Sequence, residues 1–147
     1  MPTTLVWFKR DLRIEDHAPL AAAAARGRVA PVYVAEPALW AQPTMAGRHW
    51  AFVAESLAEL RGALAARGAP LIVRVGDAAE ALAALAAEIR VDAVFAHAET
   101  GDLWSYARDR RVAETLRMAG VGFEEWPAGG VERRLRSRDG WAKRWDR

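Results

Sequence analysis

Short runs of β-branched and aromatic residues alternate along this chain with longer Ala- and Leu-rich amphipathic stretches. This alternation predicts βαβ units arranged around a parallel sheet, because parallel neighbours need a helical crossover between them. The predicted strands lie at residues 5–8, 29–35, 70–75, 92–97 and 121–126. The expected architecture is an α/β fold with a doubly wound, five-stranded parallel sheet of order 3-2-1-4-5 and helices on both faces.

Capping residues and glycines mark the ends of two predicted helices. Asp16 is predicted to cap a helix over residues 19–26, and Gly27 is predicted to end it. Asp77 and Glu80 have the spacing of a capping box and predict the start of a further helix. The residues predicted to form the buried face of that helix are Ala78, Leu82, Leu85 and Ile89.

Two longer helices are predicted over residues 46–67 and 103–118, where apolar side chains recur at helical spacing. The residues expected on their buried faces are Trp50, Val53, Leu57, Leu60 and Leu64 in the first, and Leu103, Tyr106, Ala113 and Leu116 in the second. After residue 127 the pattern predicts no strand and no long helix.

Composition excludes several kinds of chemistry. The chain has no cysteine, so disulfides, thiolate catalysis and metal ligation by sulfur are excluded. The first apolar run, residues 5–8, is interrupted by Lys9 and Arg10 well before it reaches the length of a membrane helix or signal segment. We therefore expect a soluble, cytoplasmic protein with no membrane partner.

The sequence offers no catalytic residues and no metal ligands that we can assign. His17, His49 and His97 fall on separate predicted elements without a second ligand at metal spacing, and His97 is expected to be a core or cleft-edge residue. Glu124 and Glu125 alternate across a predicted strand, so they cannot face one substrate together. Hydrolytic catalysis therefore has no support.

Charge is distributed unevenly along the chain. The net charge is +2, but residues 132–147 contain seven Lys and Arg against three Asp and Glu, which leaves −2 on residues 1–131. A basic end of this kind is typical either of a contact to nucleic acid or of a solvated linker or docking segment. Composition alone leaves both interpretations open.

The loop after the first strand, residues 9–17, places three cations and three anions in nine positions. It contains no glycine, so it cannot bring backbone amides close to a pyrophosphate, and NAD binding and a P-loop are excluded. In a Rossmann-like sheet of the predicted order, ligands bind where the strand order reverses, beyond the carboxyl ends of the strands. We therefore expect a site at the loops after the first and fourth strands, although a surface lattice of ion pairs is the alternative for residues 9–17.

Residues 5–20, from Leu5-Val6-Trp7-Phe8 through Lys9-Arg10-Asp11-Leu12-Arg13 to Asp16-His17-Ala18-Pro19-Leu20, resemble the opening signature of the DNA photolyase/cryptochrome family. Residues 31–34, 48–60 and 107–109 agree with that resemblance, and residues 130–142 resemble the family's linker. The resemblance implies an amino-terminal antenna domain over residues 1–127, and a basic linker over residues 128–147 toward a helical FAD domain that this chain lacks.

In that family the amino-terminal domain binds a light-harvesting pigment, so the resemblance implies a pigment cleft. Phe8, Val34 and Phe52 are candidate apolar walls, and Arg48 is the first candidate anchor, with a surface arginine paired to a carboxylate as its alternative. The full set of candidate pigment-binding residues is Phe8, Lys9, Arg10, Asp11, Val34, Glu36, Arg48, Phe52, Glu99 and Asp102.

The resemblance leaves the pigment open among flavin, deazaflavin, lumazine and folate types. Trp104, Ser105 and Tyr106 stand where folate-type photolyases place an Asn-Glu pair, which counts against a folate. The implied parent is a photolyase that repairs pyrimidine dimers in damaged DNA with blue light, while this chain alone is expected to be inactive. The alternatives are a cryptochrome-type photoreceptor and a stand-alone nucleotide-binding module. An exposed apolar patch is expected where the helical domain would dock.

Overall fold

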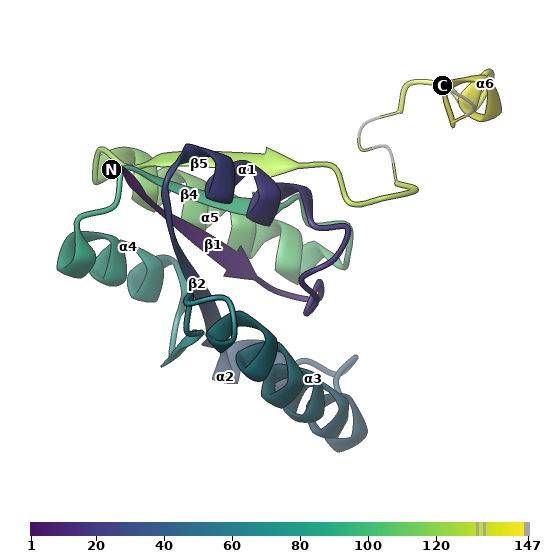
Figure 1. Cartoon of the computed structure of the whole chain (residues 1–147). Helices are drawn as coiled ribbons and strands as arrows, with labels where there is room; N and C mark the ends of the chain where they lie inside the picture. The colour runs from purple at the N-terminus through teal and green to yellow at the C-terminus, as the bar shows by residue number, and fades with distance from the viewer. Residues whose placement is uncertain (132, 134, 146–147) are drawn as a thin grey trace.

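Five parallel strands form one sheet in the order β3-β2-β1-β4-β5 in the computed structural model, which describes residues 1–131, 133 and 135–145 (Figure 1). The strands are β1 Thr3–Phe8, β2 Arg28–Ala35, β3 Ile72–Val75, β4 Ala93–His97 and β5 Gly122–Trp126. The helices are α1 Ala18–Arg26, α2 Pro37–Trp40, α3 Gly47–Ala65, α4 Ala78–Ile89, α5 Leu103–Met118 and α6 Trp141–Trp145. The predicted fold class and strand order are confirmed.

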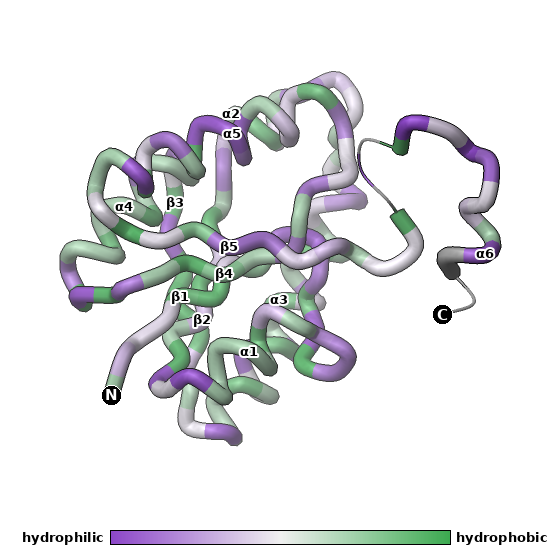
Figure 2. The backbone as a smooth tube through the Cα atoms, turned by 90° about the horizontal axis from the view of Figure 1, so that it is seen from above, coloured by the Kyte–Doolittle hydropathy of each residue, from purple (hydrophilic) through white to green (hydrophobic). Residues whose placement is uncertain are grey.

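Both faces of the sheet are covered, and alternate residues of β1 point to opposite cores. Leu5 and Trp7 pack in the core under α4 and α5, whereas Val6 and Phe8 pack in the core under α1 and α3. Figure 2 shows the sheet between these two pairs of helices. Because β1 is the central strand, its side chains from Leu5 to Phe8 are at most 1% exposed.

The long helix α3 is buried over only part of its length. Leu60 and Leu64, near its carboxyl end, are 2% exposed and pack on the sheet, whereas Trp50 and Phe52, near its amino end, are 41% and 71% exposed. Its first turns therefore project past the sheet, as the lower arm of Figure 1 shows. This projection makes the first turns of α3 one wall of a cleft, whereas its carboxyl end covers the core.

Three predictions about helix ends and faces are wrong, and one of them concerns Trp50 of α3, which was predicted to be buried but is 41% exposed. Asp16 does not cap α1: it takes a left-handed φ of 48°, and His17 caps the helix instead, through Nδ1 accepting from Leu20 N at 3.1 Å. Leu103 is 88% exposed, because α5 turns charged residues such as Arg108 and Asp109 toward the sheet. The buried residues of α5 are Ser105, Arg108, Asp109, Val112 and Leu116.

The segment after β5 has little regular structure among the described residues, where α6 is its only helix and spans five residues. Residues 132, 134 and 146–147 of the predicted basic linker lie outside the described residues. Within the part of the chain that the structure describes, every helix is too short or too polar to cross a bilayer.

The cap of α4 gives a test of the fold. Asp77 Oδ1 accepts a hydrogen bond from Glu80 N at 3.1 Å, and the Asp77 carboxylate also pairs with the exposed Arg111. Asp77→Ala should lower the free energy of unfolding in urea by about 1 kcal/mol, because it leaves a backbone donor of the first turn unpaired. Arg111→Ala removes the ion pair but keeps the cap, and should cost less than about 0.5 kcal/mol. Equal losses in the two variants would contradict the capping role.

Candidate functional site

The strand order reverses between β1 and β4, and the loops that follow these two strands lie side by side. Three contacts join them or their flanking helices: Asp11 to His97, Arg10 to Glu99, and Lys9 to Asp109 of α5. These residues lie beyond the carboxyl ends of the strands, where doubly wound sheets bind their ligands. The two loops that the sequence singled out therefore form one surface.

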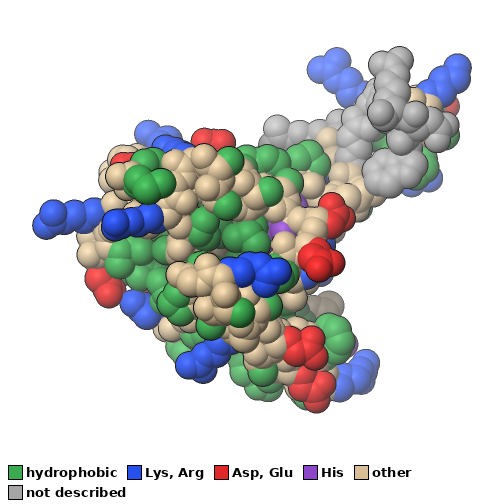
Figure 3. Space-filling view, viewed as in Figure 1, with side chains coloured by type: hydrophobic (Ala, Val, Ile, Leu, Met, Phe, Trp, Pro, Cys, Tyr) green, Lys and Arg blue, Asp and Glu red, His purple; other side chains and the backbone are tan. Residues whose placement is uncertain are grey.

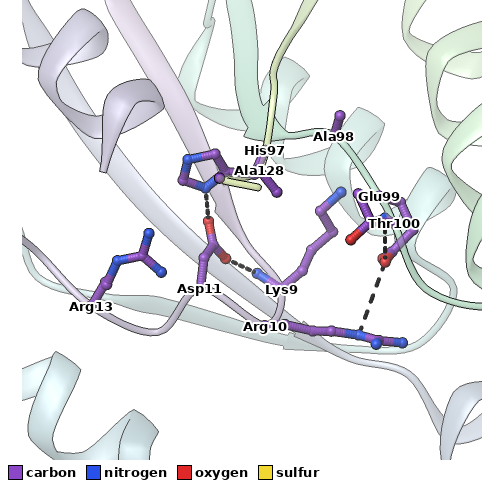
Figure 4. Close-up of a pocket in the computed structure, with 10 residues that line it drawn as sticks. Lys9, Arg10, Asp11, Arg13, His97, Ala98, Glu99, Thr100 and Ala128 are labelled. Carbon is purple, nitrogen blue, oxygen red and sulfur yellow. Dashed lines mark hydrogen bonds and ion pairs between the residues drawn. The ribbon is translucent and has the colours of Figure 1, made fainter. Parts of the chain in front are cut away.

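Asp11 is held at this surface by contacts to three nitrogen atoms. Its Oδ2 lies 2.6 Å from His17 Nε2 and 2.7 Å from His97 Nδ1, and its Oδ1 accepts from Lys9 N at 2.8 Å (Figure 4 shows the contacts to His97 and Lys9). Burial raises the pKa of Asp11, but the hydrogen bonds from the two imidazoles outweigh burial and hold the pKa well below its usual range. The carboxylate therefore stays charged and fixes the loop after β1.

His17 at the start of α1 and His97 at the end of β4 come from separate elements, as predicted. The ligand atoms of Asp11, His17 and His97 nevertheless lie within 4.8 Å of one another, which the sequence spacing did not indicate. Such a group has the composition of a metal site. However, Nδ1 of His17 accepts from Leu20 N, so in the neutral ring the proton sits on Nε2 and faces Asp11. A metal at Nε2 would move that proton to Nδ1 and break the cap of α1. The cluster is better explained as a hydrogen-bonded carboxylate.

A buried ionic network centred on Arg108 lies beneath the same surface. The guanidinium contacts Glu36 Oε1 through Nη1, Glu99 Oε2 through Nη2 at 2.9 Å, and Asp109 Oδ1 through Nε at 2.8 Å. Lys9 Nζ completes it at 2.7 Å from Asp109 Oδ2, and every one of these side chains is at most 8% exposed. The network ties the residues that follow β1 and β2, the loop after β4 and helix α5 to one another.

Two titratable groups in or beside the network have pKa values displaced by burial. Burial raises the pKa of Glu36 above its ordinary value of 4.5, although Arg108 acts in the opposite direction. Burial, together with the charge of Glu36, raises the pKa of Tyr33 to about 12. Tyr33 is therefore a neutral phenol, able to donate a hydrogen bond, over the whole physiological range of pH.

A cleft of about 840 Å³ opens above the network, between the loops and the projecting turns of α3. Figure 3 shows the molecule hollowed between the lower arm and the upper part. The residues that line the cleft are Lys9, Arg10, Leu12, Arg13, Tyr33, Leu39, Trp40, Thr44, Met45, His49, Phe52, Val53, Ser56, Thr100, Gly101 and Asp102. Its wall along α2 and α3 is mostly apolar, whereas its end at the loops is charged. Trp40 Nε1 is buried without a hydrogen-bond partner among the described residues.

The predicted site residues fall into four groups in the structure. Lys9, Arg10, Phe52 and Asp102 line the cleft. Those that lie below the cleft, around a cavity of about 30 Å³ or in the core, are Phe8, Val34, Glu36 and Glu99. Asp11 lines an adjoining pocket. Arg48 is exposed on α3 and does not line the cleft; its neighbour His49 does.

Several residues that line the site were not predicted as site residues, although Tyr33 and Ser56 lie in stretches that resemble the known family. Tyr33 and Trp40 read as strand and loop residues, and Ser56 as a polar position on an amphipathic helix; all three line the cleft. Arg108 had a signal, since residues 107–109 belong to the stretch that resembles the known family. The resemblance did not indicate that its guanidinium would bind three carboxylates.

The fold and the cleft together define a doubly wound α/β domain with a largely apolar cleft at its switch point. The family model for DNA photolyase matches residues 4–131. The chain therefore belongs to the DNA photolyase family, and it corresponds to the family's amino-terminal α/β domain.

Individual relatives support this assignment. The chain is 36% identical over 141 residues to deoxyribodipyrimidine photo-lyase of Escherichia coli, covering 89% of this chain and 27% of that protein. It is 39% identical over 127 residues to cryptochrome-1 of Sinapis alba, covering 84% and 25%. An archaeal photolyase from Sulfolobus tokodaii, solved with two FAD molecules, superposes with a TM-score of 0.76 at 29% identity, covering 85% of this chain and 29% of its own chain. The chain thus spans roughly a quarter of the length of these proteins.

Removal of the central guanidinium should destabilise the domain. Arg108→Gln leaves buried carboxylates without their counter-charge and should lower the free energy of unfolding by about 3–5 kcal/mol. Arg110→Gln, an exposed position on the same helix, should change it by less than about 0.5 kcal/mol. Urea unfolding of the two variants at neutral pH checks this difference.

The loss of unfolding free energy in Arg108→Gln should also depend on pH. A glutamate whose folded pKa is raised contributes stability below its unfolded pKa and loses it as the pH rises through the folded value. Without Arg108 the pKa of Glu36 rises further, because Arg108 lowers it in the native protein. The difference in free energy of unfolding between the variant and the native protein should therefore become smaller as the pH falls from 7 toward 5. A constant gap would show that the network is not electrostatic in origin.

Proposed function

We propose that this chain binds a light-harvesting pigment in the cleft between the loops after β1 and β4 and helix α3. The observation that carries the proposal is the cleft of about 840 Å³, apolar along α2 and α3 and charged at the switch point, in a member of the DNA photolyase family. Its size and composition suit an extended conjugated ring, since small-molecule sites typically have about 300–1,000 Å³ and few polar anchors.

The pigment is of flavin, deazaflavin, lumazine or folate type. The Sulfolobus tokodaii photolyase was solved with two FAD molecules, and its description names a novel light-harvesting cofactor. That precedent favours a flavin-type ring for this chain. Within the candidate set we assign direct contact to Lys9, Arg10, Phe52 and Asp102, which line the cleft. We assign Phe8, Asp11, Val34, Glu36 and Glu99 to the support beneath and beside it.

The domain acts within a longer photolyase that repairs pyrimidine dimers in DNA under blue light. Residues 1–127 form the antenna domain, and residues 128–147 begin the basic linker to a helical domain that holds the catalytic FAD and the damaged DNA. Support comes from the relatives, three quarters of whose length lies outside the matched region, and from the end of the sheet at Trp126. The chain itself then carries no catalytic residue, and its expected location is the cytoplasm.

A cryptochrome-type photoreceptor is the second candidate, and the match to cryptochrome-1 of Sinapis alba favours it. The two candidates share this domain and differ in what the other domain does with the excitation. A stand-alone nucleotide-binding module is less well supported, because residues 9–17 contain no glycine to admit a phosphate to the backbone.

Filling the cleft should weaken pigment binding. Ser56 faces the cleft from α3, and Ser56→Trp places an indole in the space proposed for the ring. Titration with riboflavin, a deazaflavin, a lumazine and a folate should show one of these bound at about one per chain. In Ser56→Trp its Kd should rise at least about tenfold, a loss of about 1.4 kcal/mol. Glu55→Trp adds the same side chain at the exposed neighbouring position and should leave the Kd unchanged. Unaltered binding by Ser56→Trp would place the pigment elsewhere.

The choice between photolyase and photoreceptor can be tested on the complete natural reading frame. We expect the purified full-length protein to absorb as a flavoprotein and to split pyrimidine dimers in an irradiated oligonucleotide only under blue light. The same protein kept in the dark is the control. A flavin spectrum without light-dependent repair would favour the photoreceptor, and a bound adenine nucleotide without any visible pigment would favour the stand-alone module.

A further inference from the structure

Strand β3 forms one outer edge of the sheet, and β5 forms the other. Among the described residues, β3 pairs with β2 alone. It contains neither Lys nor Pro, the residues that keep an exposed edge from pairing with another chain. In contrast, β5 contains Glu124 and Glu125, which would repel a second β5 placed beside it. The edge at β3 is therefore the one that remains open to a further strand.

The backbone of β3 presents unpaired donors and acceptors at this edge. Gly76 N donates to Ala35 O of β2 at 2.9 Å, and the main-chain groups of successive strand residues point to opposite sides. The N–H and C=O of Arg74 therefore face β2, whereas those of Val73 and Val75 face outward. No backbone hydrogen bond from another described element reaches these two valines. Their main-chain groups are available to an added strand.

The side chains of Val73 and Val75 make the same edge apolar on the α3 side of the sheet. They are 48% and 75% exposed, and they line a hollow of about 660 Å³ that residues of α2 and the start of α3 also border. The indole rings of Trp40 and Trp50 line it too, packed edge to face with their centroids 5.1 Å apart. None of the described residues that line the hollow is charged. It therefore suits the apolar side chains of a protein surface better than a small ligand that needs polar anchors.

The one charged residue of β3 is neutralised within the chain. Arg74 points to the other side of the sheet, where its Nη2 lies 3.2 Å from Glu88 Oε2 of α4. Two arginines that lie directly opposite each other on neighbouring strands repel, and a carboxylate beside each of them offsets that repulsion. Glu88 supplies this carboxylate. Two copies of β3 can therefore lie side by side with their Arg74 residues at the centre.

We propose that β3 is a dimerisation edge, at which a second copy of this chain adds its own β3 in the antiparallel direction about a two-fold axis. With Arg74 of both copies at the axis, Val73 of each copy lies opposite Val75 of the other. This register pairs the residues whose main-chain groups face outward, and each such pair exchanges two hydrogen bonds. It also places the four valines on one face of a continuous sheet, where they bury one another and extend the apolar hollow of each copy.

A second copy accounts for this edge better than a helical partner does. A helix uses its main-chain groups internally, so it can cover the valines but cannot pair with the outward groups of Val73 and Val75. The proposed pairing does not involve the pigment cleft. Because β3 has only four residues, the buried area stays below the roughly 800 Å² per partner of a stable dimer. We therefore expect a weak, reversible dimer with a Kd on the order of 10–100 µM.

Sedimentation velocity of the whole chain, at about 5–500 µM protein, tests the dimer. The native chain should change from monomer to dimer over this range. Val75→Lys should raise the Kd at least about tenfold, because it places an ammonium group from each copy in the interface. Met118→Lys is the matched control, since Met118 is 77% exposed at the end of α5, and it should leave the Kd unaltered. Glu88→Gln leaves Arg74 uncompensated and should raise the Kd by about twofold to fivefold.

Two measurements test the strand pairing separately from the apolar contact. Val75→Pro removes an outward N–H but no hydrogen bond of the β2–β3 ladder, so the dimer should be lost while circular dichroism stays native. Hydrogen exchange of the native chain gives the same test without a substitution. The amides of Val73 and Val75 should become protected as the protein concentration rises from the monomer to the dimer range.

Several results would overturn the proposal. They are a native chain that stays monomeric at the highest concentration, and a Val75→Lys variant that dimerises as the native chain does. An equal loss of the dimer in Met118→Lys would show a general effect of charge, and assemblies larger than a dimer would exclude a closed two-fold contact. Unchanged exchange at Val73 and Val75 would exclude strand pairing. Protection of these amides in a monomer of the complete natural reading frame would assign the edge to another segment of the same protein instead of a second copy.

Discussion

The guanidinium of Arg108 is the interaction on which the rest of the site depends. It contacts carboxylates from three separate places in the chain: Glu36 after β2, Glu99 after β4 and Asp109 beside it on α5. An arginine at this depth cannot lose its charge, so each carboxylate is needed to offset the cost of burial. Because the partners sit at the carboxyl ends of neighbouring strands, satisfying the charge also fixes the floor of the cleft.

Two further features convert that floor into a binding surface. Asp11, held by His17 and His97, orders the loop after β1, which carries Arg10 and Arg13 to the rim. Helix α3 begins beyond the edge of the sheet, so its first turns stand away from the core and leave a space that side chains of the sheet do not fill. The cleft therefore results from a helix that is longer than the strand layer it covers, and its charged end results from loops that the buried network holds in place.

The sequence predicts the fold well and the site in part. The alternation of strand and helix signals predicted the doubly wound parallel sheet, whose expected order the structure confirms, and the glycine-free charged loop at residues 9–17 indicated the switch point. The network could not be predicted, since Arg108 and Glu36 are 72 positions apart and nothing local in either segment indicates their pairing. Asp11 and His97, 86 positions apart, meet for the same reason. Leu103 was wrongly predicted to be buried because the prediction used the helical spacing of apolar residues, whereas the buried face of α5 includes the charged residues Arg108 and Asp109.

The selectivity of the cleft follows from which charges the chain leaves without an internal partner. Buried ionic groups that satisfy one another, as Arg108 does with its carboxylates, shape the site but offer a ligand little, because any new contact would have to replace one that already exists. Recognition then falls to groups at the rim that the chain does not neutralise. Of the arginines at this site, Arg108 has three carboxylate contacts, Arg10 one long contact and Arg13 none among the described residues. The number of internal carboxylate contacts therefore falls from the floor of the cleft to its rim. Residues at the floor maintain the fold, and residues at the rim can distinguish one pigment from another.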